Sequence, residues 1–185
     1  MAMAVSVPRY TIADLERLPN DGNRYELLDG VLLVTPAPSY AHQIIVSRLQ
    51  FRLMKAVMVS GDAHVVGPGA ITVPPKTQLE PDILVFPARY PIDAKWEAID
   101  EHWLAVEVLS RSSRVYDREI KRDAYIALGV QEVWLVDRWN KSVEVSRAGG
   151  RGDREGDIAL DVLRWRVPTL SLEVEISLTE VFAGL

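Results

Sequence analysis

Two acidic residues in this 185-residue sequence stand where apolar strands are expected. Asp82 follows Pro81 and opens the apolar run 82–86, and Glu107 interrupts a second apolar run at 103–109. Carboxylates are rarely buried alone, because losing water is costly unless a cation or several donors replace it. A divalent metal ion shared by both carboxylates would meet that need. The pair therefore predicts metal-assisted phosphodiester chemistry.

A lysine that follows the second run is the third candidate. The apolar spacing predicts a helix over 114–128, and Lys121 shares one of its faces with Asp117 and Tyr125. This face is half apolar and turns toward the sheet. The ammonium group of Lys121 can therefore bring a positive charge to the two carboxylates.

Strand alternation gives Glu107 a direction. Alternate residues of a strand share a face, so Glu107 lies with Ala105 and Leu109, opposite Val106 and Val108. We expect packed protein around it rather than open water. A carboxylate without compensation there would either raise its pKa or recruit a cation.

The composition limits the possible fold classes and cellular locations. With 48% hydrophobic and 25% charged residues, the chain is typical of one globular domain, predicted over residues 1–185. It contains no cysteine, which excludes disulfides, zinc-thiolate sites and thiol nucleophiles. The N-terminus lacks a basic segment followed by a long apolar run, and no later run reaches membrane-spanning length. We therefore expect a cytoplasmic protein.

The overall charge is acidic, at −5 with a pI near 5.3. This balance disfavours strong non-specific binding to nucleic acids, which depends on neutralising phosphates. Residues 111–122 are locally basic, and this excess lies beside the candidate site. Its basic members, against Asp117 and Glu119, are Arg111, Arg114, Arg118, Lys121 and Arg122.

The first half of the chain alternates short helices and strands. Asp29-Gly30 is typical of a type I′ hairpin turn, Ser39 is a helix N-cap, and Gly61 ends the long helix that follows. The predicted elements are a helix over 11–18, strands 24–28 and 31–35, a helix over 40–59, and strands 64–66, 70–73 and 82–86.

The second half predicts a strand-helix crossover followed by an antiparallel return. Ser112 or Ser113 caps the helix over 114–128, which ends at Gly129. The other predicted elements are strands 103–109, 130–136, 142–146, 158–163 and 172–176, a mobile polar loop over 149–156, and a capping box at 177–180. The order of elements indicates an α/β fold.

Several short segments together resemble a known family. The chain is similar to the Uma-type putative restriction endonucleases, a branch of the PD-(D/E)XK nuclease superfamily. The resemblance extends over more than a hundred residues, in matching order and spacing. The matching segments are residues 24–30, Ala37-Pro38-Ser39 with His42, Pro81-Asp82, residues 106–110, residues 117–121 with Tyr125, and residues 129–137.

This resemblance implies a restriction-endonuclease-like mixed sheet flanked by helices, with Asp82 and Glu107 as metal ligands. The family pattern usually places a lysine two residues after the second acid, where this chain has Leu109. Lys121 would then replace that lysine from the helix. A second departure is Arg111, which stands where the resemblance implies proline.

The implied chemistry is a hydrolysis of DNA phosphodiester bonds with Mg²⁺, for which Mn²⁺ could substitute. Asp82, Glu107 and the Val108 carbonyl would hold the metal at roughly 2.1 Å, leaving positions for water and phosphate oxygens. Lys121 would orient the attacking water or stabilise the developing charge. Glu26 would complete the metal shell or hold a water beside it.

Simpler interpretations are open for the three principal residues. Asp82 could be a solvent-facing residue at the start of a strand. Glu107 could form a structural ion pair with Arg114 or Arg118. Lys121 could be a solvated helix lysine whose stem covers apolar surface.

Other residues carry similar alternatives. Glu26 could pair across its hairpin, and His42 is typical of a capping or packing residue in a first helical turn. Trp134, Trp139 and Trp165 are expected to serve the core or a dimer surface rather than base stacking.

Two functions follow from these alternatives. In the first, the protein is a Mg²⁺-dependent DNA endonuclease that acts as a homodimer, so that two sites address two strands. In the second, it is a catalytically silent binding or assembly module with the same fold. Convergence of Asp82, Glu107 and Lys121 on one pocket is the observation that separates them.

Overall fold

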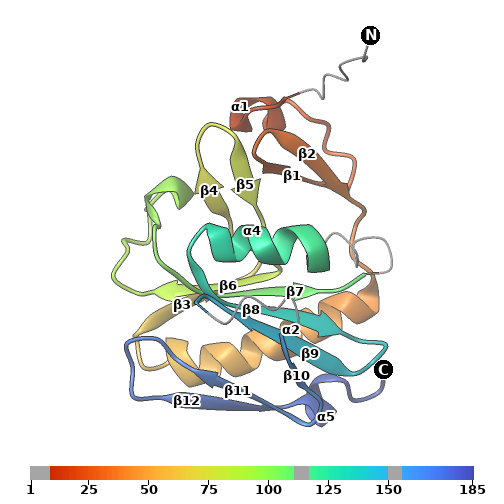
Figure 1. The fold of residues 1–185 in the computed structure, drawn as a ribbon, viewed down its shortest axis with the longest axis vertical. Helices are drawn as coiled ribbons and strands as arrows, with labels where there is room; N and C mark the ends of the chain where they lie inside the picture. The colour runs from red at the N-terminus through yellow and green to blue at the C-terminus, as the bar shows by residue number, and fades with distance from the viewer. Residues whose placement is uncertain (1–8, 111–116, 150–155) are drawn as a thin grey trace.

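The computed structural model describes residues 9–110, 117–149 and 156–185. Its described elements are stacked in layers: a four-stranded sheet, the helix α4, a six-stranded sheet, and then the helix α2 with a two-stranded hairpin beneath it (Figure 1). The six-stranded sheet is therefore covered on both faces. This arrangement is the α/β fold that the element order predicts, a mixed sheet flanked by helices.

The four-stranded sheet begins with the predicted hairpin. β1 (Arg24–Leu28) and β2 (Val31–Thr35) pair antiparallel across Asp29 and Gly30, whose φ angles are 45° and 79°. Positive φ at both positions is the requirement of a type I′ turn. The sheet, in the order β2-β1-β5-β4, is completed by β5 (Thr77–Leu79) and β4 (Ile71–Val73).

The six-stranded sheet has the order β10-β9-β8-β7-β6-β3. Among its described strand pairs, only β7 with β8 is parallel, and the chain between them includes α4. This pairing confirms the predicted crossover and antiparallel return. The strands are β3 (Ala63–Val66), β6 (Ile83–Pro87), β7 (His102–Val108), β8 (Val130–Asp137), β9 (Ser142–Arg147) and β10 (Asp157–Ala159).

The helices and the last hairpin cover the two faces. α4 (Arg122–Ala127) continues a π-helical turn, η3 (Asp117–Lys121), and lies between the two sheets. On the opposite face, α2 (Tyr40–Leu53) starts at Ser39, whose hydroxyl accepts from the His42 N–H, and continues as η1 (Met54–Met58). The last hairpin consists of β11 (Val162–Arg166) and β12 (Glu173–Ser177). The remaining elements are α1 (Ile12–Leu15), η2 (Trp96–Ala98) and α5 (Leu178–Val181).

Each face of β7 belongs to a different core. Val106 and Val108 pack in the cluster that includes α2 and the last hairpin, whereas Ala105 and Leu109 pack with α4 and the four-stranded sheet. The predicted alternation is therefore confirmed, and it places Glu107 on the α4 side. Its carboxylate is directed into the layer where the four-stranded sheet, η3 and β7 meet.

Some predicted boundaries are wrong. The first helix ends at Leu15 rather than residue 18, because the N–H groups after it bond three residues back, as in a turn. The stretch 158–163 is two strands, since the chain bends at 160–161 and leaves β9 for β12. β5 was not predicted, being three residues long among prolines. β6 begins at Ile83, directly after Asp82.

Three predictions fall wholly or partly on residues outside the described ranges. These are the absence of an export signal at the N-terminus, the N-cap of the helix over 114–128, and the polar loop over 149–156. Within the described ranges, the helix is seen from 117 onward and stops before Gly129, whose φ is 88°. No helix in these ranges is long and apolar enough to cross a membrane.

The last hairpin packs on the six-stranded sheet through a pair of tryptophans. Trp165 of β11 is buried edge-to-face against Trp134 of β8, with ring centroids 6.1 Å apart. Trp165→Ala should lower the free energy of unfolding by about 3–5 kcal/mol in urea titration, because it leaves a large cavity. Ile92→Ala, at a side chain 91% exposed, should change it by less than about 0.5 kcal/mol. Equal small losses in both variants would contradict this packing.

Candidate functional site

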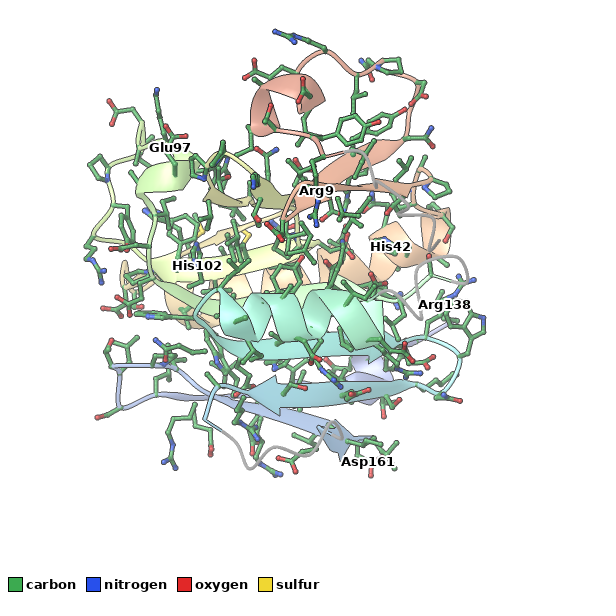
Figure 2. The ribbon with its side chains drawn as sticks, turned by 45° about the horizontal axis from the view of Figure 1, so that its top comes forward. Arg9, His42, Glu97, His102, Arg138 and Asp161 are labelled. Atoms are coloured by element: carbon green, nitrogen blue, oxygen red, sulfur yellow. The ribbon has the colours of Figure 1, made fainter. Side chains whose placement is uncertain are left out.

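A pocket of about 260 Å³ lies where β7 ends, α2 begins and β8 turns toward β9. Its walls come from segment 35–39, the first turn of α2, Asp82, segment 107–110 and the start of η3. Figure 2 shows His42 and Arg138, which both line this pocket, on the same side of the molecule. Segments far apart in the sequence therefore converge on one cavity.

Asp82 is buried at the start of β6 and held by three donors. Nη1 of Arg24 lies 3.1 Å from its Oδ1, while Nε2 of His42 and the Val108 N–H lie 3.0 Å and 2.9 Å from its Oδ2. Burial alone would raise the pKa of Asp82, but the His42 hydrogen bond and the charges of His42 and Arg24 hold it below its usual value. Asp82 is therefore an ionised carboxylate in a fixed orientation.

Glu107 is buried on β7 in a different environment. Its Oε1 accepts from the Tyr125 hydroxyl at 2.6 Å and from Nζ of Lys121 at 3.1 Å. Burial raises its pKa to about 8, against the lowering effect of Lys121, and the charges of Asp82 and other nearby carboxylates add to the rise. Without a further cation, this site favours the protonated form of Glu107 near neutral pH.

Lys121 connects Glu107 to the early hairpin. Its ammonium group forms an ion pair with Oε2 of Glu26 at 2.6 Å, and the other Glu26 oxygen accepts from the Glu80 N–H at 2.7 Å. Burial alone would lower the pKa of Lys121, but the charges of Glu107 and Glu26 raise it above its usual value. Lys121 is therefore a permanent cation, only 4% exposed.

The predicted residues converge. Asp82, Glu107, Val108 and Lys121 all line the pocket, and Glu26 lies behind it on β1, in contact with Lys121. Helical periodicity explains the position of Lys121, because Asp117, Lys121 and Tyr125 are all buried on the face predicted to turn toward the sheet.

The simpler interpretations of Asp82 and Lys121 are wrong, and that of Glu107 is tested only for Arg118. Asp82 is 4% exposed rather than solvent-facing, and Lys121 is not solvated. Glu107 does form an ion pair, but with Lys121; Arg118 instead lies 3.2 Å from Asp137 and 3.4 Å from Glu144. Arg114 is outside the described residues.

The remaining alternatives are resolved by position. Glu26 pairs with Lys121 rather than across its hairpin. The backbone N–H of His42 donates to the Ser39 cap, whereas the His42 side chain is buried against Asp82. Trp134 and Trp165 lie in the core as expected, whereas Trp139 only partly packs there and also lines the pocket.

Sequence reasoning missed some residues of the site. Arg24 and Tyr125 contact the two carboxylates. Both belong to segments that carried the family resemblance, and Tyr125 also lies on the helix face predicted to turn toward the sheet. The side-chain role of His42 was hidden behind its position in a first helical turn. The pocket-lining position of Trp139 had no signal in the sequence.

The predicted basic excess of residues 111–122 is largely neutralised in its described part. Arg118 pairs with Asp137 and Glu144, and Arg122 pairs with Asp123 and Glu144, with nitrogen-oxygen distances of 2.9–3.4 Å. Acidic residues of β8, β9 and α4 supply these partners. Arg111 and Arg114 lie outside the described residues.

The donor set fits a hard divalent cation. Oxygen ligands suit Mg²⁺ and Mn²⁺, and the charge of Asp82 acts directly on the pKa of Glu107, so a cation between them would relieve both. In the described ranges, no cluster of three or more His, Asp or Glu side chains is arranged to hold a metal alone. A metal held by Asp82 and Glu107 would therefore need backbone, water or phosphate oxygens to complete its shell.

Comparison with known proteins identifies the family and the fold. The family described as "Uma2: Putative restriction endonuclease" matches residues 12–180. The crystal structure of a putative nuclease belonging to DUF820 from Anabaena variabilis ATCC 29413 superposes with a TM-score of 0.73. It is 19% identical in sequence, and the alignment covers 93% of this chain and 97% of that one, so it shares the fold. Comparison with curated proteins found no match.

The family match extends over nearly the whole described chain and includes every residue of the carboxylate pocket. The fold shared with the Anabaena protein agrees with it. The chain therefore belongs to the Uma2 family of putative restriction endonucleases, and it has their restriction-endonuclease-like α/β fold.

Proposed function

We propose that this protein is a Mg²⁺-dependent endonuclease that hydrolyses phosphodiester bonds of DNA. The observation that carries the proposal is the convergence of Asp82, Glu107 and Lys121 on one pocket. Burial and nearby carboxylates raise the pKa of Glu107 there. A carboxylate in this state gains most from a divalent cation. Membership of the Uma2 family supports a nuclease, and the metal, the substrate and the residue roles are our own assignments.

Asp82 and Glu107 are the proposed metal ligands, joined by the Val108 carbonyl. Asp82 is oriented for this role by Arg24, His42 and the Val108 N–H. When bound, Mg²⁺ or Mn²⁺ would lower the pKa of a water and offset charge on the phosphate. Glu107 must release its proton, and its contact with Lys121 must loosen or shift, for the carboxylate to serve as a ligand.

Lys121 acts as a donor rather than as a base. Its raised pKa keeps it protonated at neutral pH, so it would orient the attacking water and stabilise negative charge on the phosphate oxygens. Glu26 is the residue that positions Lys121, since it holds the ammonium group from the side of β1. Tyr125 plays the corresponding part for Glu107 by donating its hydroxyl.

The wider assignments follow from this chemistry. Cleavage of a duplex needs a site for each strand, so we propose that the protein acts as a homodimer on DNA. A cytoplasmic location is part of the same proposal, since its substrate would be intracellular DNA.

One observation favours a second candidate function, a catalytically silent binding or assembly module. Lys121 already contacts Glu26 and Glu107, and Asp82 already has three donors, so the charged groups partly satisfy one another without a metal. In that case the acids would serve stability alone. The two functions differ in whether the pocket binds a divalent cation and cleaves DNA.

Substitutions in the pocket test the catalytic assignment. Supercoiled, linear and single-stranded DNA should be cleaved with Mg²⁺ or Mn²⁺ by the intact protein. Glu107→Gln and Lys121→Met should each lower the cleavage rate by about 100-fold or more, because each removes charge from the reacting centre. The measurement is the rate of nicking on agarose gels, with folding checked by circular dichroism.

Matched controls lie far from the pocket. Glu97→Gln and Lys95→Met change two exposed charged residues. Glu97 lies in η2 and Lys95 directly precedes it. Figure 2 shows Glu97 on the opposite side of the molecule from His42. Both should cleave like the wild type. Unchanged cleavage in the folded pocket variants would reject the site, whereas absence of cleavage by every form would favour the silent module.

The pKa of Glu107 gives metal binding a defined pH dependence. Below about pH 8 the metal-free protein holds a proton on Glu107 that a metal ligand must release. Mn²⁺ affinity measured by titration calorimetry should therefore rise by up to about tenfold per pH unit from pH 6 toward 8, and then level off. Proton release should be visible as buffer-dependent heat.

Glu107→Gln is the control for this titration, because its side chain does not ionise. The variant should bind Mn²⁺ more weakly and without the rise between pH 6 and 8. A wild-type affinity that is flat over this range, or that falls as the pH rises, would show that the metal displaces no proton from Glu107.

A further inference from the structure

Arg138 is the cation of the pocket that has no carboxylate partner among the described residues. The pocket is lined by the cations Arg24, Lys121 and Arg138. Arg24 pairs with Asp82, and Lys121 with Glu26 and Glu107. Arg138 instead lies over an aromatic ring, with its Cζ 4.5 Å from the ring centroid of Trp139. Its charge is not explained by the ion pairs that stabilise the fold.

The turn that carries Arg138 is held rigidly. It joins β8 to β9 between the paired residues Asp137 and Ser142. Asp137 is 1% exposed, and its side chain accepts from the N–H groups of Trp139 and Asn140 at 3.0 Å and 3.2 Å. A carboxylate that bonds the backbone just after itself fixes a turn. Arg138 is therefore presented from a fixed backbone.

The stacking fixes the guanidinium group as well. Trp139 is partly buried against the core on the α4 side, so its ring is a firm support. An arginine on an aromatic face loses less side-chain entropy on binding, and its planar N–H groups match two phosphate oxygens. A leucine would cover Trp139 equally well. Packing on Trp139 therefore does not require the positive charge of Arg138, and binding of an anionic ligand would explain it.

We propose that Arg138, supported by Trp139, binds a backbone phosphate of the DNA strand next to the phosphate that reacts at Asp82 and Glu107. The inference rests on the proposed nuclease function and adds a binding residue to it. The carboxylates inside the pocket repel a polyanion. Arg138, a cation of the pocket wall without a carboxylate partner in the described ranges, can attract the strand and fix its position. The ligand class is a phosphodiester.

Binding of DNA without cleavage tests this inference. The probe is a short fluorescein-labelled duplex with Ca²⁺, an oxygen-binding cation of looser geometry than Mg²⁺, followed by anisotropy over a range of salt concentrations. Arg138→Gln should weaken binding on the order of tenfold near 0.1 M salt and reduce the salt slope of log K by about 0.9, the value for one lost phosphate contact.

Two further variants separate the effect of the Arg138 charge from the effect of its stacking on Trp139. Arg138→Lys should retain most of the salt slope and bind with intermediate affinity, because the charge stays while the planar fork is lost. Trp139→Leu should weaken binding by about two- to fivefold with the slope retained, through loss of the cation-π support. Arg166→Gln is the matched control, since Arg166 is an exposed arginine on β11, in the layer beyond α2, and should bind like the wild type.

The outcomes distinguish this inference from the proposed function. If Arg138→Gln binds with unchanged affinity and slope, or if no form binds DNA, the inference is wrong even when cleavage occurs. Polyglutamate serves as a second ligand for comparison. If Arg138→Gln weakens binding to polyglutamate but leaves binding to DNA unchanged, Arg138 belongs to a site for an acidic protein partner and the inference is wrong. If Arg138→Gln loses DNA affinity and slope while Glu107→Gln leaves cleavage unchanged, the phosphate contact stands and the catalytic assignment fails.

Discussion

The contact of one buried ammonium group with two buried carboxylates is the constraint on which the site depends. Lys121 lies between Glu107 on β7 and Glu26 on β1, so it joins the two sheets and the helical layer between them. Loss of Lys121 would leave Glu26 and Glu107 buried without the cation that both contact, which is strongly destabilising. The crossover that places η3 and α4 between the sheets is thus also the feature that assembles the site.

The same constraint sets the chemistry of the pocket. Asp82 has donors enough to stay ionised, while Glu107 shares one lysine with Glu26 and has a raised pKa. Two carboxylates with opposite pKa shifts lie in one cavity, and a divalent cation would bring both to the ionised state. In the proposed mechanism Lys121, kept protonated by these neighbours, would serve as an electrostatic group rather than as a base.

Local signals predicted the parts of the fold that local physics decides. The Asp29-Gly30 turn, the Ser39 cap and the strand alternation around Glu107 were confirmed, as was the buried face of Lys121. The partners of Asp82 were not predictable, since Arg24 and His42 reach it from distant elements and only tertiary packing brings them together. The break at residues 160–161 was missed for a related reason, because the choice between two sheets is made by packing rather than by propensity.

Sharing of one divalent cation by Asp82 and Glu107 is the central proposal for this site. An anomalous difference map from crystals containing Mn²⁺ tests it most directly, because it locates the metal without reference to activity. We predict a peak at roughly 2.1 Å from a carboxylate oxygen of each residue, with Glu107 moved away from Lys121. A map at saturating Mn²⁺ with no peak in the pocket, and with the contact between Glu107 and Lys121 unchanged, would contradict the claim.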